Sequence, residues 1–552
     1  MKHQEILTPW QRLFGLLKLE KRAIMQVIYY AIFAGLVSLS LPLGIQAIIN
    51  LIQGAQITTS WIVLVILVTL GVGFVGVLQL MQMRIIETIQ QRIFTRASFE
   101  FTFRFPKIQM NELRDNYPPE LANRFFDTIN VQKEFAKLLV DVLAAVLQIV
   151  FALILLSFYH PFFIVFGVLL LLLVYVVFKF TAKTGMQTSL EESKNKYKVA
   201  HWIQEVARTV VSFKLSGKTS LALDKNDELV TEYLNARESH FRILVVQFIQ
   251  MIGFKVIVTA GLLIIGGILV LNQEMNIGQF VAAEIIILLV ISSVEKLILG
   301  LESFYDILTS LEKIGQVVDK DLEAQTGDEP IFKENFLIEL KDLTYGVSDR
   351  DNNILENINI KIPSNTSLWI RGESGSGKSS LLRLIAGLLK PTKGNVFLND
   401  LSLQNLNIKK YRSNIGLSLS EETPFEGTLR ENITFGDNSI TDEQVFWAIE
   451  KVGLTDLVKE SANGLNTFIN PEGKQISYTK SKKIILARAI VTNPKVLILE
   501  DPLDQFETEE ANKIISFLTD IEKPWTLIVA SINERWENKC IKTITLKEGK
   551  TV

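Results

Sequence analysis

The sequence is poor in cysteine and histidine, the two side chains that most often bind transition metals. Cys540 is its only cysteine, so no disulfide can form within the chain and a CxxC metal or redox site is excluded. Of its four histidines the last is His240, which leaves the C-terminal half of the chain without an imidazole. A formal net charge of −2 gives no reason to expect nucleic acid as a partner.

Charged residues are also scarce over long stretches of the first half of the chain. At 552 residues the chain is too long for one core, and its mean hydropathy of +0.27 is high for a soluble protein. The charge-free run 162–178 argues against buried helices of a soluble protein. We therefore predict an α-helical membrane domain with six transmembrane helices in a lipid bilayer, at about 24–50, 60–82, 136–158, 162–180, 244–271 and 277–299.

Basic residues indicate how these spans are oriented. Lys18, Lys21 and Arg22 precede the first span, and the long connections 83–135 and 181–243 are rich in lysine and arginine. The short loops between the other span ends contain neither residue. By the positive-inside rule, both termini and both long connections are predicted to be cytoplasmic.

Three residues inside the spans stand out. Pro42 in the first span predicts a kink. Lys255 in the fifth span is close enough to the cytoplasmic end to snorkel to the interface. Glu284 in the sixth span is open to two interpretations, a position on a translocation path or an interhelical hydrogen bond.

A glycine-rich phosphate-binding motif follows the apolar half. A strand-like run at 367–370 leads into it and a helix-like run at 381–389 leads out, the context that the motif requires. Backbone N–H groups would cradle the phosphates, Lys378 would reach the β- and γ-phosphates, and the Ser379 hydroxyl would hold Mg²⁺. We predict binding of a nucleoside triphosphate by Gly372, Glu373, Ser374, Gly375, Ser376, Gly377, Lys378, Ser379 and Ser380.

The segment around 319–330 is acidic and poor in apolar residues, as expected of a linker, and strands alternate with helices from Phe336 onward. This order of six spans, linker and α/β phosphate-loop domain resembles a half-transporter of the ATP-binding cassette (ABC) exporter family. The resemblance also includes the motifs at 387–394, 427–433, 486–490 and 494–499, and a first coupling helix at 119–124. The predicted domains are a transmembrane domain at 1–315, a linker at 316–335 and a P-loop NTPase domain at 336–552.

Membership in this family implies ATP and Mg²⁺ as cofactors, a second half-transporter as partner and an exported cargo that the sequence does not identify. It also implies a multi-pass protein of the bacterial cytoplasmic membrane, with the nucleotide domain in the cytoplasm. The candidate catalytic pair is Glu500 and Asp501, where the family has an aspartate for the Mg²⁺ shell and then a glutamate that activates water. Glu500 can still reach the metal, but Asp501 is one methylene short.

Other positions also depart from the family pattern. The signature falls at 476–480, where both glycines are replaced; the usual loop glutamine is Ser420, and the switch histidine is Ile532. The aromatic that stacks on adenine aligns with Val347, with Tyr345 as a possible substitute. Together these changes predict ATP binding with slow or absent hydrolysis.

Three functions remain open on this basis. The first is the catalytically degenerate half of a heterodimeric ABC exporter. The second is a homodimeric exporter that hydrolyses ATP with non-standard residues. The third is a regulatory membrane subunit of a secretion complex.

Overall fold

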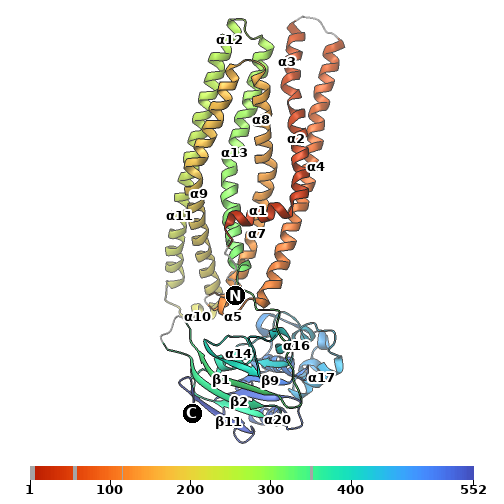
Figure 1. Cartoon of the computed structure of the whole chain (residues 1–552), viewed down its shortest axis with the longest axis vertical. Coiled ribbons are helices and arrows are strands. Elements are labelled where there is room, and N and C mark those ends of the chain that lie inside the picture. The colour runs from red at the N-terminus through yellow and green to blue at the C-terminus, as the bar shows by residue number, and fades with distance from the viewer. Residues whose placement is uncertain (1–6, 54–58, 115, 348–351) are drawn as a thin grey trace. The chain divides into compact units, whose positions relative to one another are not determined.

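The computed structural model describes residues 7–53, 59–114, 116–347 and 352–552, and the chain divides into two compact units (Figure 1). A helical unit contains Met1–Lys107 and Asp115–Asp321. A sheet unit contains Leu322–Val552 together with Ile108–Arg114. A short segment of the first long connection therefore belongs with the C-terminal unit, more than 200 residues away in sequence.

Within the described residues, six helical stretches are long and apolar enough to cross a membrane, which confirms the prediction of six spans. Helices α4, α9, α11 and α13 have 46, 47, 41 and 42 residues, about twice what a bilayer requires, so they extend well beyond the hydrocarbon. The six stretches consist of α2 (Lys21–Ser38) with α3 (Ser40–Gln53), α4 (Thr59–Arg104), α6 (Pro118–Asn123) with α7 (Asp127–Lys137) and α8 (Leu143–Ser157), α9 (Phe162–Arg208), α11 (Leu221–Gly261) with α12 (Gly267–Leu271), and α13 (Ile277–Val318). The shorter helices of the first half are α1 (Pro9–Leu19), α5 (Met110–Leu113) and α10 (Val210–Leu215).

Helix α13 forms the centre of the helical unit. Its Ile286, Val290 and Val294 are fully buried, and α7, α8, α3 and α9 pack around it. By contrast, Leu70 and Leu80 of α4 are exposed, as expected of a face that meets lipid. Helices α9 and α11 run side by side along their length (Figure 1).

The polar and helix-breaking residues of the spans have distinct outcomes. The first span is interrupted between α2 and α3 at Leu39, because Pro42 has no N–H to donate to the carbonyl one turn earlier; this confirms the predicted kink. Lys255 of α11 pairs with α13, since its Nζ lies 2.5 Å from the carboxylate of Glu295. Glu284 is half-buried on α13 and forms no hydrogen bond or ion pair with the residues that the structure describes.

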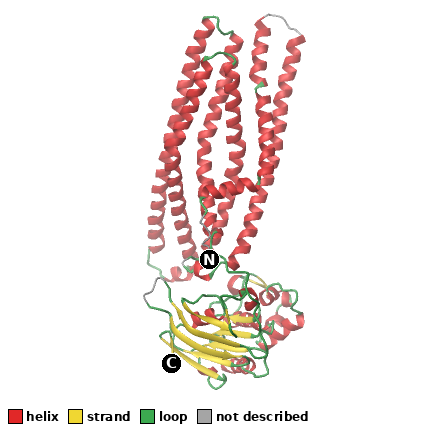
Figure 2. Cartoon of the chain, viewed as in Figure 1, coloured by secondary structure: helices red, strands yellow, loops and turns green. Residues whose placement is uncertain are grey.

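The sheet unit contains two larger sheets, whose strands are yellow in Figure 2. Among the described residues, the antiparallel sheet has the order β2-β1-β4-β5 and the other has the order β12-β11-β3-β10-β9-β6. The strands are β1 (Leu337–Tyr345), β2 (Leu355–Pro363), β3 (Ser367–Arg371), β4 (Lys393–Leu398), β5 (Leu401–Ser402), β6 (Ile415–Ser418), β7 (Gly427–Thr428), β8 (Phe468–Ile469), β9 (Val496–Glu500), β10 (Thr526–Ala530), β11 (Lys542–Lys547) and β12 (Lys550–Thr551). The helices are α14 (Lys378–Ile385), α15 (Ile408–Arg412), α16 (Leu429–Thr434), α17 (Asp442–Lys451), α18 (Thr455–Glu460), α19 (Tyr478–Ile490) and α20 (Thr508–Leu518).

The parallel register determines which segments meet. Ala530 of β10 is opposite Ile370 of β3 and Glu500 of β9, and Leu499 is opposite Ser418 of β6. The segments that follow these four strands therefore emerge at one edge of the sheet, the usual place for a ligand in an open α/β sheet. The central strands are buried on both faces and accordingly read as continuous apolar runs.

Candidate nucleotide-binding site

The phosphate loop connects β3 to α14 at this edge. Gly375 and Gly377 have φ values of 82° and 101°, a region that favours glycine, and a Cβ on Gly377 would come within 2.7 Å of the Leu355 side chain. Helix α14 begins at Lys378, three residues earlier than the sequence pattern indicates, and ends at Ile385, close to Gly387 with φ of 69°.

The interior of the loop is suited to phosphate. Lys378 Nζ donates to the carbonyls of Gly372 and Glu373 at 2.7 and 2.8 Å, which keeps the ammonium inside the loop. The hydroxyl of Ser376 is buried and has no hydrogen-bond partner among the described residues. A buried cation and an unpaired hydroxyl at a helix N-terminus form an environment that an anion would complete.

Glu500, at the end of β9, has both carboxylate oxygens engaged. One accepts a hydrogen bond from the Ser379 hydroxyl, and the other accepts from the Ser420 N–H at 3.3 Å. The Glu500 side chain is buried, and its two hydrogen bonds join the start of α14 to the loop that follows β6. The fold thus brings together the two residues predicted to hold Mg²⁺, Ser379 and Glu500.

A buried lysine that sequence reasoning missed holds the other side of the Ser420 loop. Lys482 of α19 donates from its ammonium to the carbonyl of Ser420 and, at 3.0 Å, to that of Glu422. Burial lowers the pKa of Lys482, while nearby carboxylates, first that of Glu422, act in the opposite direction. Burial likewise raises the pKa of the Glu422 carboxyl, which lies 3.7 Å from the guanidinium of Arg488.

Asp501 follows Glu500 with a φ of 39°, in a backbone region that few non-glycine residues adopt. Its N–H donates to the Ala530 carbonyl at 2.9 Å. Its Oδ1 is buried and has no hydrogen-bond partner among the described residues. The candidate water-activating carboxylate is therefore held at the sheet edge by its backbone, and no described side chain orients it.

The segment at the signature position begins a helix. Ser477 is the N-cap of α19, and its hydroxyl accepts from the Lys480 N–H at 3.2 Å. Where the family has glycines, the exposed ring of Tyr478 occupies the first turn, and Lys480 pairs with Glu460 at 3.4 Å. The helix N-terminus is present, and the ring of its first residue, Tyr478, lies 5.5 Å from the Lys482 ammonium.

Two further positions singled out from the sequence, Ile532 and Tyr345, lie outside the phosphate loop. Ile532 follows β10 and is 57% exposed, so the switch position presents an aliphatic side chain. Tyr345, proposed as a substitute for the adenine-stacking aromatic, is only 6% exposed and belongs to the apolar core of the antiparallel sheet. Its role in stacking on adenine stays a prediction.

This geometry defines a P-loop nucleotide-binding domain attached to a six-span membrane domain. Family models agree: the ABC transporter model matches residues 355–504, and the ABC transporter transmembrane region matches residues 24–294. The chain belongs to the ABC transporter family, as an exporter with a membrane domain and an ATP-binding domain.

Curated relatives include the alpha-hemolysin translocation ATP-binding protein HlyB of Escherichia coli O157:H7, which is 30% identical over 283 residues, 51% of this chain and 40% of HlyB. The leukotoxin translocation ATP-binding protein LktB of Mannheimia haemolytica is 26% identical over 332 residues, 60% of this chain and 46% of LktB. The matches thus span less than half the length of these relatives. A bacterial Atm1-family ABC exporter with ATP bound has the same fold, with a TM-score of 0.80, 15% identity and coverage of 97% of this chain and 95% of that chain.

Proposed function

We propose that this chain is the ATP-binding but catalytically degenerate half of a heterodimeric ABC exporter. The observation that carries the proposal is Glu500, whose two carboxylate oxygens are bound by Ser379 and Ser420. A group held in this way can support nucleotide binding, but it is not free to orient a water. The next residue, Asp501, has a side chain one methylene shorter than the glutamate that the family uses for that task.

ATP would bind with its phosphates in the loop 372–379, where Lys378 turns from the loop carbonyls toward the β- and γ-phosphates. The Ser379 hydroxyl and the Glu500 carboxylate would hold Mg²⁺, since both are oxygen ligands and already lie in hydrogen-bond contact. The ion offsets the negative charge of the phosphates when it is bound. Ser420, shorter than glutamine, would leave this ligand set with only two protein side chains.

The predicted changes affect both the phosphate-loop side and the signature side of the site, which supports a different half-transporter as partner. In the family, each ATP lies between one subunit's phosphate loop and the other subunit's signature. Tyr478 would place a side chain where a glycine lets the helix backbone approach the opposing γ-phosphate, and Ile532 has no proton to donate. A homodimer would therefore contain no complete site, whereas a competent second half-transporter would supply an intact aspartate–glutamate pair and a histidine.

The second candidate is a homodimeric exporter with non-standard chemistry, which one observation favours. The buried Oδ1 of Asp501 has no partner among the described residues, and an unpaired carboxylate oxygen at the sheet edge is available to accept a proton. In this alternative Asp501 would be the base.

We further propose that the chain resides in a bacterial cytoplasmic membrane with its nucleotide domain in the cytoplasm. The basic residues of the long connections and the bacterial origin of the relatives HlyB and LktB support this location. These two relatives are named for translocation of toxins, but the apolar spans of this chain carry no motif that selects a cargo.

The decisive measurement is Mg²⁺-dependent ATPase activity of the purified chain in lipid, with Lys378→Ala as the blank. We expect ATP to stabilise the wild-type chain against thermal unfolding, and Lys378→Ala to abolish this stabilisation, because the variant lacks the loop's ammonium. We expect turnover no higher than the blank. Turnover clearly above it would favour the homodimer, and unchanged ATP stabilisation in Lys378→Ala would refute the phosphate-loop assignment.

A further inference from the structure

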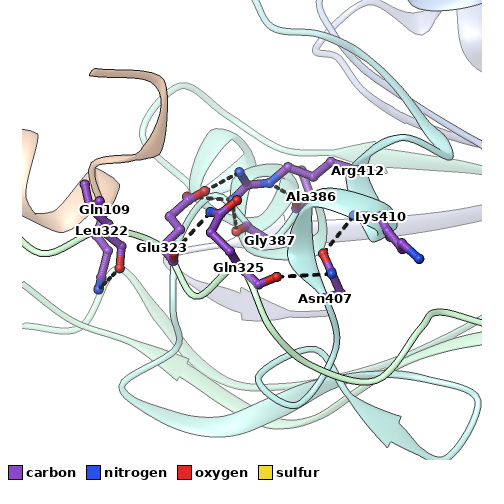
Figure 3. A network of polar contacts seen from close by, with 9 residues as sticks. All are labelled: Gln109, Leu322, Glu323, Gln325, Ala386, Gly387, Asn407, Lys410 and Arg412. Atoms are coloured by element: carbon purple, nitrogen blue, oxygen red, sulfur yellow. Dashed lines mark hydrogen bonds and ion pairs between the residues drawn. The ribbon is translucent and has the colours of Figure 1, made fainter. Parts of the chain in front are cut away.

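A stretch of the linker, residues 322–329, lies on the sheet unit as an additional extended segment, which we call the linker strap (Figure 3). Asp328 pairs with Leu406 as in a parallel ladder: its N–H donates to the Asn405 carbonyl, and the Asn407 N–H donates to its carbonyl, both at 2.8 Å. Gly327 permits this approach, because a Cβ there would lie 2.6 Å from the Asn405 carbonyl oxygen. The strap is therefore bound to the unit by backbone hydrogen bonds.

The strap also holds the segment Ile108–Arg114, which connects α4 to α6. Ile108 is buried and forms an antiparallel bridge with Leu322. Gln109 donates to the Leu322 carbonyl at 3.1 Å (Figure 3). It also accepts from Lys390 at 3.0 Å. Leu322 closely follows the end of α13, so the strap is continuous along the chain with α13, and the segment that it holds is continuous with α4 and α6.

Arg412, the last residue of α15, joins the strap to the phosphate-loop helix. Its guanidinium binds both carboxylate oxygens of Glu323 in the strap, at 2.7 and 2.8 Å (Figure 3). The same group donates to the Gly387 carbonyl at 2.6 Å and to the Ala386 carbonyl at 3.4 Å. Ala386 is the C-cap of α14, whose first two residues are Lys378 and Ser379.

Helix α14 is therefore held at both ends. It has eight residues, about 12 Å of rigid helix, with the phosphate loop at its N-terminus and Arg412 at its C-terminus. A displacement of its N-terminus cannot be absorbed along so short a helix and must reach the carbonyls at its other end. The side chains of Arg412 and Glu323 are 26% and 13% exposed, so solvent screens their pairing only in part.

We propose that Arg412 is a positioning residue that couples nucleotide binding at α14 to the linker strap. The strap continues into α13, and the bound segment Ile108–Arg114 continues into α4 and α6, so the coupling reaches these three helices. The proposal rests on the nucleotide site proposed above. ATP binding shifts α14, Arg412 transmits the shift to Glu323, and the strap moves the ends of the three helices. The coupling depends on one fork-shaped side chain that contacts both partners, which a lysine cannot replace.

A spin-label experiment on the full chain in lipid nanodiscs tests this coupling. Labels at Phe99 of α4 and Leu234 of α11, which are 74% and 56% exposed, would report ATP-induced distance changes in a Cys540→Ser background. The variants are Arg412→Gln, Arg412→Lys and Glu323→Gln. The matched control is Lys410→Gln, which removes a second ion pair between α15 and the strap, to Glu329, without touching α14.

We expect every variant to bind ATP within about threefold of the wild-type affinity, because none of these residues lines the loop. The ATP-induced distance change should persist in Lys410→Gln and fall by at least about threefold in Arg412→Gln and Glu323→Gln. Arg412→Lys should behave like Arg412→Gln, since its ammonium can keep the pairing with Glu323 but cannot fork onto the α14 carbonyls.

Two outcomes would overturn the coupling. An undiminished distance change in Glu323→Gln and Arg412→Gln would exclude the ion pair as a coupling element. A full change in Arg412→Lys would mean that Arg412 merely attaches the strap. If Arg412→Gln fails to fold, Glu323→Gln alone decides, because it leaves Arg412 on α14. Failure of the wild-type chain to bind ATP would instead refute the proposed nucleotide site and, with it, the coupling.

Discussion

At the scale of single residues, the site is governed by how buried charges are paired. Glu500 and Lys482 bind the same loop residue from opposite sides, Glu500 at the Ser420 N–H and Lys482 at its carbonyl. A loop fixed on both sides is suited to holding a nucleotide and poorly suited to the movements of a catalytic cycle. The sequence reveals Lys482 and Glu500, but not that both bind the Ser420 loop. Lys482 lies within α19 and Glu500 ends β9, and only the fold defines how these two elements lie against that loop.

Glu422 next to this loop gives a pH prediction. Burial raises its pKa above the ordinary 4.5, so the folded chain holds a proton there that the unfolded chain has lost, and stability falls as pH rises through that window. The variant Glu422→Gln removes the free-energy cost of burying this carboxylate. We expect its melting temperature to exceed that of the wild type by about 2 °C at pH 7.5, with the gain shrinking as pH falls toward 4.5.

Thermal unfolding followed by intrinsic fluorescence at several pH values measures this difference. Glu421→Gln is the matched control. The Glu421 side chain is exposed, and its surface ion pair with Arg383 contributes little to stability. A gain that grows toward low pH would contradict the prediction.

At the scale of elements, local patterns were predictable and contacts between elements were not. The six spans, the Pro42 break and the strand–loop–helix at 367–385 follow from hydropathy, proline chemistry and glycine spacing, all of which act within a few residues. The pairing of Lys255 with Glu295 depends on the rotation of α11 against α13, which no local pattern determines. The burial of Tyr345 likewise depends on how the strands of the sheet pack, which no local pattern determines.

The ion pair between α11 and α13 predicts a non-additive effect. Both side chains are 34% exposed, and removing either partner leaves the other charge unpaired within a span. We expect Lys255→Met and Glu295→Gln each to lower the melting temperature more than the double variant does, with a coupling energy of about 0.5–1.5 kcal/mol. Thermal unfolding of the four proteins of the cycle in nanodiscs measures it.

Glu284→Gln is the control for this cycle, because Glu284 lies on the same helix without a partner among the described residues. Combined with Lys255→Met, it should give additive effects. Additivity of Lys255→Met with Glu295→Gln would mean that the two charges do not interact in the bilayer.

At the scale of the whole molecule, the proposed function combines an intact anion-binding element with residues predicted to depart from the family pattern at the base, signature and switch positions. The phosphate loop and its helix keep their geometry, while Asp501, Tyr478 and Ile532 stand where the family has a base, a glycine and a histidine. These positions lie in separate segments, after β9, in α19 and after β10, so no single structural change accounts for them. We expect them to act as a unit, because hydrolysis requires all of them in one site.

A stepwise repair of the chain tests this expectation. Glu500→Asp with Asp501→Glu restores the family pair, yet we expect no turnover above the Lys378→Ala blank, because Tyr478 still replaces a signature glycine and Ile532 offers no imidazole. Adding Ser420→Gln, Tyr478→Gly, Thr479→Gly, Lys480→Gln and Ile532→His should raise turnover at least about 100-fold over the blank, since a repaired homodimer would contain two complete sites. ATPase assays in nanodiscs measure both steps. Full activity after the first step alone would mean that the signature and switch positions are not required, and that the chain needs no partner to complete its site.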